Sequence, residues 1–241
     1  IFSNGTIETR LRDSATFMAK NFDLRKFPFD SQKLTFELYS EYPSTIVSLE
    51  AEDTMEEYKN TLYEFEGDEG ITIPGWKLTA VEYETYEYVD TDNFPYKGFL
   101  LHLNVERISS FYIYKIILPI MFIWAISWSV FWVRGSQLDA KVNVTIVCLL
   151  ALIAYNFIID EDLPKLSYLT FLDSFILLSY FFTGIATILC VYSYVRHVKS
   201  GKDLTIIDEY AHFLGPLLYF LSIAAIGIYF YSLKGALALF K

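Results

Sequence analysis

Four long apolar runs in the second half of this sequence constrain its fold more than any other feature. They cover roughly residues 109–133, 142–159, 166–195 and 211–233. Each run reaches the roughly 18–20 apolar residues that an α-helix needs to cross the hydrocarbon core of a bilayer. The sequence therefore predicts a transmembrane domain of four helices within residues 108–241.

The first 107 residues have a different composition and predict a β-sheet domain. They are rich in Asp, Glu, Tyr and Thr, and apolar and polar residues alternate in 34–39, 77–86 and 100–106. Such alternation is typical of half-buried antiparallel strands. Only about six strands fit, and a β-sandwich usually has more. We therefore expect an extracellular antiparallel β-sandwich whose N-terminal part is missing, followed by the four-helix transmembrane bundle.

Charged loops between the apolar runs predict the orientation in the membrane. The loop at 160–165 is mostly acidic, whereas the other two loops are basic and hold Arg134, Lys141, Arg196, Lys199 and Lys202. Because Lys and Arg favour the cytoplasmic side, these two basic loops are expected inside. Residues 1–107, the 160–165 loop and the C-terminus are then extracellular or periplasmic. The predicted location is the plasma membrane, which is the inner membrane in a bacterium.

One face of the second apolar run has the character of a pore lining. Steps of three and four residues place its members on a single side of a helix. A charge at each end, one amide and an apolar middle suit a water-filled channel better than lipid. The alternative is a buried helix whose end charges lie at the membrane interfaces. The predicted pore-lining residues are Asp139, Asn143, Val147, Leu150, Ala154, Phe157 and Glu161.

A membrane enzyme and a non-conducting receptor are the two alternatives to a channel. An enzyme would have to use His197, His212 or Asp173, but neither nucleophile–base nor metal-ligand spacing joins them, so we expect no enzyme and no cofactor. A non-conducting receptor or scaffold remains the alternative, and lipid-like residues all around the second helix would support it. No nucleic-acid partner is expected.

Residues 22–34 carry a resemblance to a known family. Their sequence, Phe-Asp-Leu-Arg-Lys-Phe-Pro-Phe-Asp-Ser-Gln-Lys-Leu, resembles the signature loop of the pentameric ligand-gated ion channels, the Cys-loop receptor superfamily. Lys20 and Leu34 stand where the family has its bridged cysteines, as in bacterial members that lack the disulfide. Further similar motifs follow in the family's order: Arg107, Pro119, Asn143-Val-Thr, Leu163-Pro-Lys165 and Asp173.

This resemblance implies a homopentamer in which five copies of the second helix ring a pore. Asp139 would then form a ring of carboxylates at the cytoplasmic mouth, which attracts cations and repels anions. Lys141 is expected to turn away from the pore axis. The gate is expected at Leu150 and Phe157, because a narrow apolar constriction expels water and blocks ions. The expected partners are four identical subunits, membrane lipid, permeant cations and an agonist.

The resemblance also implies how the two domains are coupled. The tip of the signature loop would rest on the 160–168 loop, and Asp30 would pair with Arg107. A partly desolvated, bidentate pair of this kind can hold two rigid bodies in register. The alternative is a surface ion pair of little energetic value. The predicted coupling residues are Phe27, Pro28, Phe29, Asp30, Arg107, Pro164 and Lys165.

Aromatic residues near 83–96 suggest an agonist site. This segment resembles the family's capping loop, and a tyrosine-rich box suits a cationic amine. Ordinary strand packing is the alternative, because tyrosines also alternate along strands. The predicted ligand-binding residues are Tyr83, Tyr86, Tyr88, Phe94 and Tyr96.

Acidic residues within 50–69 suggest a second ligand. Their density of oxygen ligands suits Ca²⁺ as a modulator, although no EF-hand spacing is present. A solvated acidic face and a proton sensor are the alternatives. The agonist therefore stays open between a small molecule, a proton and a divalent ion. The predicted metal ligands are Glu64, Glu66, Asp68 and Glu69.

Overall fold

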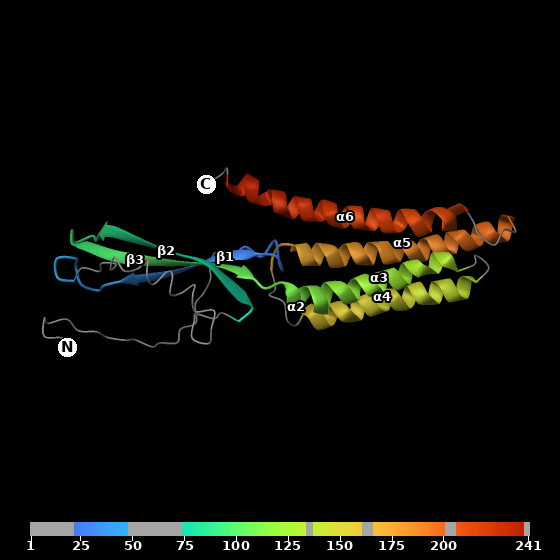
Figure 1. The fold of residues 1–241 in the computed structure, drawn as a ribbon, viewed down its shortest axis with the longest axis horizontal. Coiled ribbons are helices and arrows are strands. Elements are labelled where there is room, and N and C mark those ends of the chain that lie inside the picture. The colour runs from blue at the N-terminus through green and yellow to red at the C-terminus, as the bar shows by residue number, and fades with distance from the viewer. Residues whose placement is uncertain (1–21, 48–73, 134–136, 161–165, 201–205, 239–241) are drawn as a thin grey trace.

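The computed structural model describes residues 22–47, 74–133, 137–160, 166–200 and 206–238. In these residues an antiparallel sheet stands at one end of a bundle of long helices (Figure 1). The predicted order, a sheet domain followed by four membrane-spanning helices, is confirmed. The second layer of the predicted sandwich is not part of the described sheet and stays a prediction.

Three strands form the sheet: β1 (Ser31–Tyr39), β2 (Trp76–Val89) and β3 (Pro95–Arg107), in the order β1-β3-β2. Both pairings are antiparallel, so β3 is the central strand. β2 and β3 form a hairpin whose turn includes Asn93 at φ 67°, a backbone conformation that asparagine tolerates better than most residues. The three predicted runs of alternation lie inside these strands, which confirms them.

The first membrane span runs from Ser110 to Trp132 and is not a uniform α-helix. It consists of α2 (Ser110–Tyr112), the π-helical η1 (Ile113–Ile117), α3 (Leu118–Trp128) and the 3₁₀-helical η2 (Ser129–Trp132). Pro119 has no backbone N–H, and just before it the amide of Leu118 donates to the carbonyl of Ile113, five residues back. A proline inside a helix is a common cause of such a π-bulge.

The other three spans are continuous helices: α4 (Leu138–Asp160), α5 (Phe171–Ser200) and α6 (Ile206–Ala238). α3, α4 and α5 pack against one another, and α6 lies on the α5 side of the bundle (Figure 1). All four described spans are long and apolar enough to cross a bilayer. The chain is therefore a multi-pass membrane protein with four spans.

The third span begins at Phe171 rather than near residue 166, because Thr170 caps it. The Thr170 hydroxyl accepts from the amide of Asp173 at 3.1 Å, and the Asp173 carboxylate accepts from the Thr170 amide at 2.9 Å. This reciprocal pair is a capping box, which supplies acceptors for amides at the helix start that have no partner within the helix. The same span extends past residue 195 to Ser200, through a last turn that contains His197 and Lys199.

Tryptophans of the first span anchor α6 to the bundle. Trp124 stacks on Tyr219 with ring centroids 3.9 Å apart, and Trp128 donates its indole N–H to the carbonyl of Ala211 at 2.9 Å. Both indoles are buried, and the Trp128 ring lies directly against Gly215 of α6. Trp132, one turn further, is 65% exposed at the end of the span.

Close packing of Trp128 on Gly215 predicts a size limit at this position. A Cβ at Gly215 would overlap the indole of Trp128, which is buried and also held by its hydrogen bond to Ala211. We expect Gly215→Ala to lower the free energy of unfolding by about 1–3 kcal/mol, the usual cost of overpacking. Gly227→Ala on the same helix is the control, since nothing lies within 4 Å of its added Cβ. Thermal unfolding in detergent measures both, and equal melting temperatures would contradict the assignment.

Candidate pore-lining face and coupling loop

The helix α4 has two unlike sides, and one of them packs against its own bundle. Lys141, Thr145 and Leu152 are 1%, 0% and 2% exposed, and Cys148 and Ile159 are also buried. The spacing of these residues puts them on one side of a helix with 3.6 residues per turn. This side faces α3 and α5, both of which contact α4.

The predicted stripe lies on the opposite side of α4, about half a turn away. Val147, Leu150 and Phe157 are 63%, 59% and 70% exposed in the single chain. Asp139, Asn143 and Ala154 are exposed as well. Glu161, the last member of the stripe, lies outside the described residues. A single chain therefore leaves the whole described stripe uncovered.

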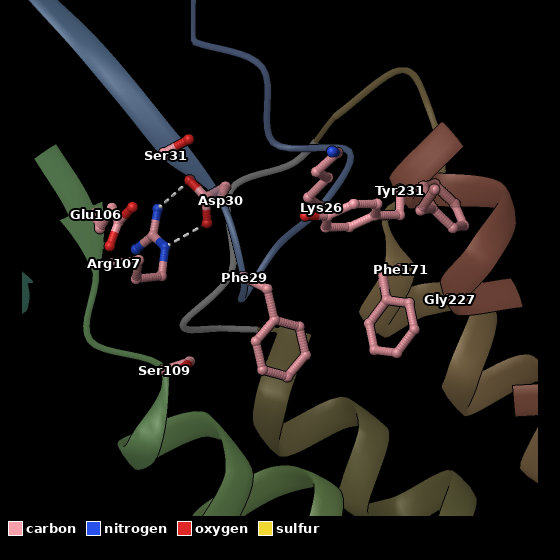
Figure 2. Close-up of a pocket in the computed structure, with 11 residues that line it drawn as sticks. Lys26, Phe29, Asp30, Ser31, Glu106, Arg107, Ser109, Phe171, Gly227 and Tyr231 are labelled. Atoms are coloured by element: carbon pink, nitrogen blue, oxygen red, sulfur yellow. Dashed lines mark hydrogen bonds and ion pairs between the residues drawn. The ribbon is translucent and has the colours of Figure 1, made fainter. Parts of the chain in front are cut away.

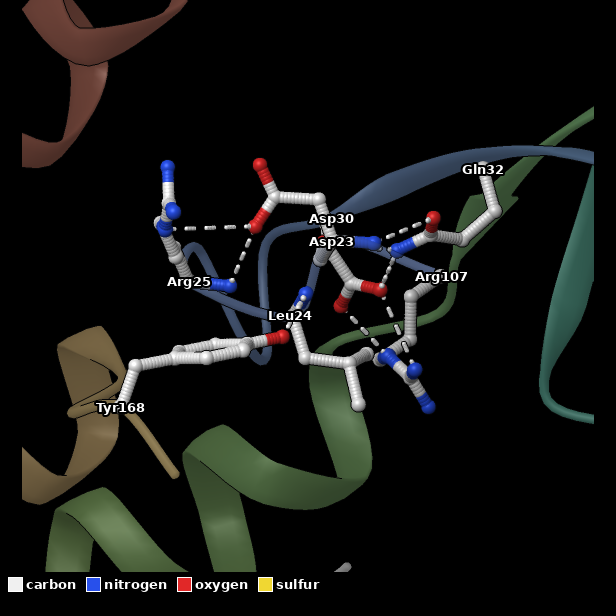
Figure 3. Close-up of polar contacts among 7 residues, drawn as sticks. All are labelled: Asp23, Leu24, Arg25, Asp30, Gln32, Arg107 and Tyr168. Carbon is white, nitrogen blue, oxygen red and sulfur yellow. Dashed lines mark hydrogen bonds and ion pairs between the residues drawn. The ribbon is translucent and has the colours of Figure 1, made fainter. Parts of the chain in front are cut away.

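The signature loop, residues 22–34, holds a buried ion pair with the end of β3. Arg107 donates from Nε to Asp30 Oδ1 at 2.6 Å and from an Nη to Asp30 Oδ2 at 3.1 Å (Figure 3). The Asp30 side chain is fully buried, and that of Arg107 is 13% exposed. Gln32 donates a further hydrogen bond to Asp30 Oδ2 at 2.7 Å. The expected pair thus forms, in bidentate and buried geometry.

Aromatic rings enclose the Arg107 guanidinium on other sides. Its carbon lies 4.1 Å from the ring centroid of Trp76 and 4.8 Å from that of Phe27. An arginine stacks on aromatic faces while its planar fork binds a carboxylate, which lysine cannot do. Three separate segments therefore meet at Arg107: the signature loop, β2 and the end of β3.

The tip of the signature loop reaches the helical bundle at the start of α5. The amide of Phe171 donates to the carbonyl of Arg25 at 2.8 Å, and that of Leu172 donates to the carbonyl of Phe27 at 3.3 Å. The Phe29 ring meets the Phe171 ring edge-on, with centroids 5.7 Å apart. Because these contacts include backbone hydrogen bonds, the loop and α5 are directly joined.

Two more aromatic contacts extend this junction. Tyr168 accepts at its hydroxyl from the amide of Leu24 at 3.0 Å (Figure 3), and Phe27 packs on Tyr112 of the first span with centroids 4.7 Å apart. Tyr168 lies in the predicted 160–168 partner segment, whereas Pro164 and Lys165 lie outside the described residues. The contacts of Trp76 and Tyr112 at this junction were not predicted from the sequence, because no local pattern assigns their partners.

A cavity of about 650 Å³ lies beside this junction, between the loop and the C-terminal half of α6 (Figure 2). Lys26 projects over the Tyr231 ring at 4.8 Å, and Phe29 and Phe171 line the wall toward α5. The charged side chains of the Asp30–Arg107 pair form another part of the wall. Through Tyr231, α6 therefore contacts the same loop that joins the sheet to α5.

Tyrosines of the β2–β3 hairpin form a cluster, but not of all five predicted residues. Tyr88 stacks on both Tyr86 and Tyr96, with centroids 6.1 Å and 5.3 Å apart. Tyr83 instead stacks on Phe99, on the other face of the sheet, because strand residues an odd number apart point to opposite faces. Phe94 lies at the hairpin turn and is 52% exposed.

A carboxylate accompanies the tyrosine cluster. The Tyr86 hydroxyl donates to Glu37 of β1, and this hydrogen bond raises the pKa of Tyr86 to about 12. Tyr86 therefore stays a neutral donor at physiological pH. The four proposed calcium ligands at 64–69 lie outside the described residues. Among the residues that the structure does describe, no group of three His, Cys, Asp or Glu side chains is placed to hold a metal ion.

Comparison with known proteins shows which family the membrane-spanning part of this chain resembles. Residues 116–208 match the family described as the neurotransmitter-gated ion-channel transmembrane region. Over most of its length the chain is similar to members of the Cys-loop superfamily of ligand-gated ion channels. Its relatives include bacterial and animal members, and the signature loop, the arginine before the first span and the four helices all fit the assignment.

Three relatives show the range of the family. The chain is 28% identical to a proton-gated ion channel of Gloeobacter violaceus, covering 95% of this chain and 61% of that protein. It is 25% identical to a γ-aminobutyric acid receptor subunit β-4 of Gallus gallus and 24% identical to a γ-aminobutyric acid receptor subunit β of Lymnaea stagnalis. In both, the match covers 83% of this chain and under two-fifths of the receptor subunit, 39% and 38% respectively. The chain thus spans less than two thirds of each of these relatives.

Burial of the Asp30–Arg107 pair predicts a large cost for breaking it. Asp30→Asn leaves a desolvated guanidinium without its counter-charge, and we expect a loss of about 3–5 kcal/mol in the free energy of unfolding. Arg107→Lys keeps the charge but loses the bidentate fork, so its loss should be smaller. In a thermal double-mutant cycle, Asp30→Asn with Arg107→Gln should cost less than the sum of the single changes. Additive losses would mean that the two side chains act independently.

Proposed function

We propose that this chain is a subunit of a homopentameric, cation-selective, ligand-gated ion channel whose pore is lined by α4. The observation that carries this proposal is the two-sidedness of α4. The buried side of the helix packs against the other helices of the same chain, while Asp139, Asn143 and the apolar stripe remain exposed. A carboxylate and an amide facing lipid would be unfavourable, whereas the same groups facing water are not.

Neighbouring subunits would cover the flanks of the exposed stripe. Ile146 and Ile153, on one flank, are 42% and 40% exposed, and Val144, on the other, is 37% exposed. Five copies around an axis would bury these flanks between adjacent α4 helices and leave the stripe facing the pore. A non-conducting scaffold, the alternative function, gives no comparable reason for a polar end on an otherwise apolar exposed stripe.

The charges near the inner end of α4 support cation selectivity. Asp139 is exposed on the stripe side, while Lys141 is 1% exposed on the opposite side. A ring of five Asp139 carboxylates would raise the local concentration of cations, and the buried lysines would not oppose it at the pore surface. On this proposal residues 1–107 and the C-terminus lie outside the plasma or inner membrane.

The agonist is proposed to act through the sheet and the signature loop. One relative is named a proton-gated channel, which makes protons the first agonist to test. His102 is the only histidine in the sequence of residues 1–107. It contacts Thr35 of β1 at 2.9 Å and faces Glu84 of β2 at 4.0 Å. Amines at the tyrosine cluster and calcium at residues 64–69 are the alternatives.

Gated current from the full-length protein in planar bilayers tests the proposed function. The protein is exposed in turn to a pH series, to calcium and to primary and quaternary amines, at fixed voltage. A current that one of these agonists opens supports a channel. A protein that forms pentamers in detergent but passes no current under any of the three would favour the non-conducting receptor.

Selectivity gives a prediction at the inner mouth. We expect Asp139→Ala to lower the cation-to-anion permeability ratio and the single-channel conductance, because it removes the ring of charge. Asp139→Glu, which keeps the charge, is the control and should retain the preference. Reversal potentials in asymmetric salt give the ratio. Unchanged ratios in Asp139→Ala would place the selectivity constriction elsewhere.

The gate gives a prediction in the apolar middle. Leu150→Ser introduces five hydroxyls into the driest part of the proposed pore, and wetting then becomes easier. We expect leak current without agonist, or activation at lower agonist concentration. Leu149→Ser is the control: it changes a neighbouring leucine that lies off the stripe, and it should produce no leak current without agonist. A leak in Phe157→Ser but not in Leu150→Ser would move the gate toward the outer mouth.

A further inference from the structure

The carbonyl of Lys115 occupies an unusual position in the first span. In a regular α-helix it would accept from the amide four residues later, but that residue is Pro119, which has no N–H. A backbone carbonyl without a donor is costly inside a bilayer, where no bulk water replaces the missing bond. At this point the first span has lost its regular helical donor, and a donor from another helix can take its place.

That donor is a side chain of α4. The Tyr155 hydroxyl donates to the carbonyl of Lys115, across the contact between the first span and α4. A second tyrosine ties the other side of the same helix, since the Tyr180 hydroxyl of α5 donates to the carbonyl of Leu152 at 3.1 Å. α4 is thus hydrogen-bonded to both neighbouring helices within one turn of its length.

The position of these bonds along α4 relates them to the exposed stripe. Tyr155 and Leu152 lie between Leu150 and Phe157 in sequence, but on the side of the helix that faces the bundle. Leu150 and Phe157 therefore lie on either side, along the helix axis, of the hydrogen bonds that join α4 to its neighbours. A tilt or rotation of α4 that changed the width at Leu150 would have to stretch or break these bonds.

We propose that Tyr155 is a positioning residue for the gate, and that its action depends on the carbonyl that Pro119 leaves open. This inference rests on the proposed channel function. The bond stabilises the arrangement of α4 described here, because moving the hydroxyl away deprives the Lys115 carbonyl of this donor. An equilibrium between two arrangements is shifted by any contact that is made in only one of them. Tyr155 thereby biases the equilibrium between closed and open pores.

A double-mutant cycle between Tyr155→Phe and Pro119→Ala tests the proposal. Tyr155→Phe removes only the hydroxyl. Pro119→Ala restores an amide that can donate to the Lys115 carbonyl within the helix, so the hydroxyl becomes dispensable. In the parent background we expect Tyr155→Phe to shift the half-activating agonist concentration by about threefold or more, the size of an ordinary interhelical hydrogen bond in a membrane. In the Pro119→Ala background the shift should largely disappear.

Two further measurements make the outcomes distinct. Thermal unfolding in detergent repeats the same cycle without any current, so a parent protein that does not conduct still reports whether the two residues are coupled. Tyr114→Phe, at a 70% exposed tyrosine of the first span, is the control for hydroxyl removal and should shift neither quantity. Permeability ratios should stay unchanged in all variants, because Asp139 is untouched.

Equal effects of Tyr155→Phe in the two backgrounds would overturn the proposal, since a role in packing alone does not depend on the amide of residue 119. An unchanged half-activating concentration in a conducting parent would overturn the gating role, even if the thermal cycle showed coupling. The proposal is supported if the parent conducts and Tyr155→Phe shifts the half-activating concentration only when Pro119 is present. The thermal cycle should then show that the two residues are coupled. A silent parent would count against the channel function and not against the hydrogen bond.

Discussion

Arg107 is the last residue of β3, and the first membrane span begins three residues later at Ser110. Its guanidinium is bound to Asp30 and stacked on Trp76, so the end of the sheet is held to the signature loop just where the chain turns into the membrane. The loop in turn is hydrogen-bonded to the start of α5. Removing one partner of this ion pair would leave a buried charge where sheet, loop and helices meet.

The bilayer imposes a second constraint, which acts on the backbone rather than on the side chains. Each span must satisfy its own amides and carbonyls, because lipid offers no hydrogen bonds. α5 meets this requirement with the Thr170–Asp173 capping box, and the first span with a π-bulge before Pro119 and a tyrosine from α4. This hydrogen bond from Tyr155 links the first span to the proposed pore helix.

The two sides of α4 connect these constraints to the proposed function. Its bundle side carries Lys141 and Thr145, buried against the subunit's own helices, while its other side is left exposed from Asp139 to Phe157. The buried lysine is favourable for cation selectivity only because the helix register turns it away from Asp139. A shift of two residues in that register, a rotation of roughly 200°, would bring Lys141 to the exposed side in place of Asp139.

The length of the apolar runs was enough to predict the four spans. Local periodicity was enough to predict the three described strands and the stripe on α4, because spacing alone decides which residues share a face. The same rule separates Tyr83 from Tyr86 and Tyr88, and the spacing Thr170-x-x-Asp173 is a sequence signal for the start of α5. The Asp30–Arg107 pair was predicted from a resemblance. Its burial, its stacking on Trp76 and the Tyr155–Lys115 bond were decided only by the tertiary structure. These contacts join segments tens of residues apart, and no local pattern specifies which distant partner satisfies a buried charge or an open carbonyl.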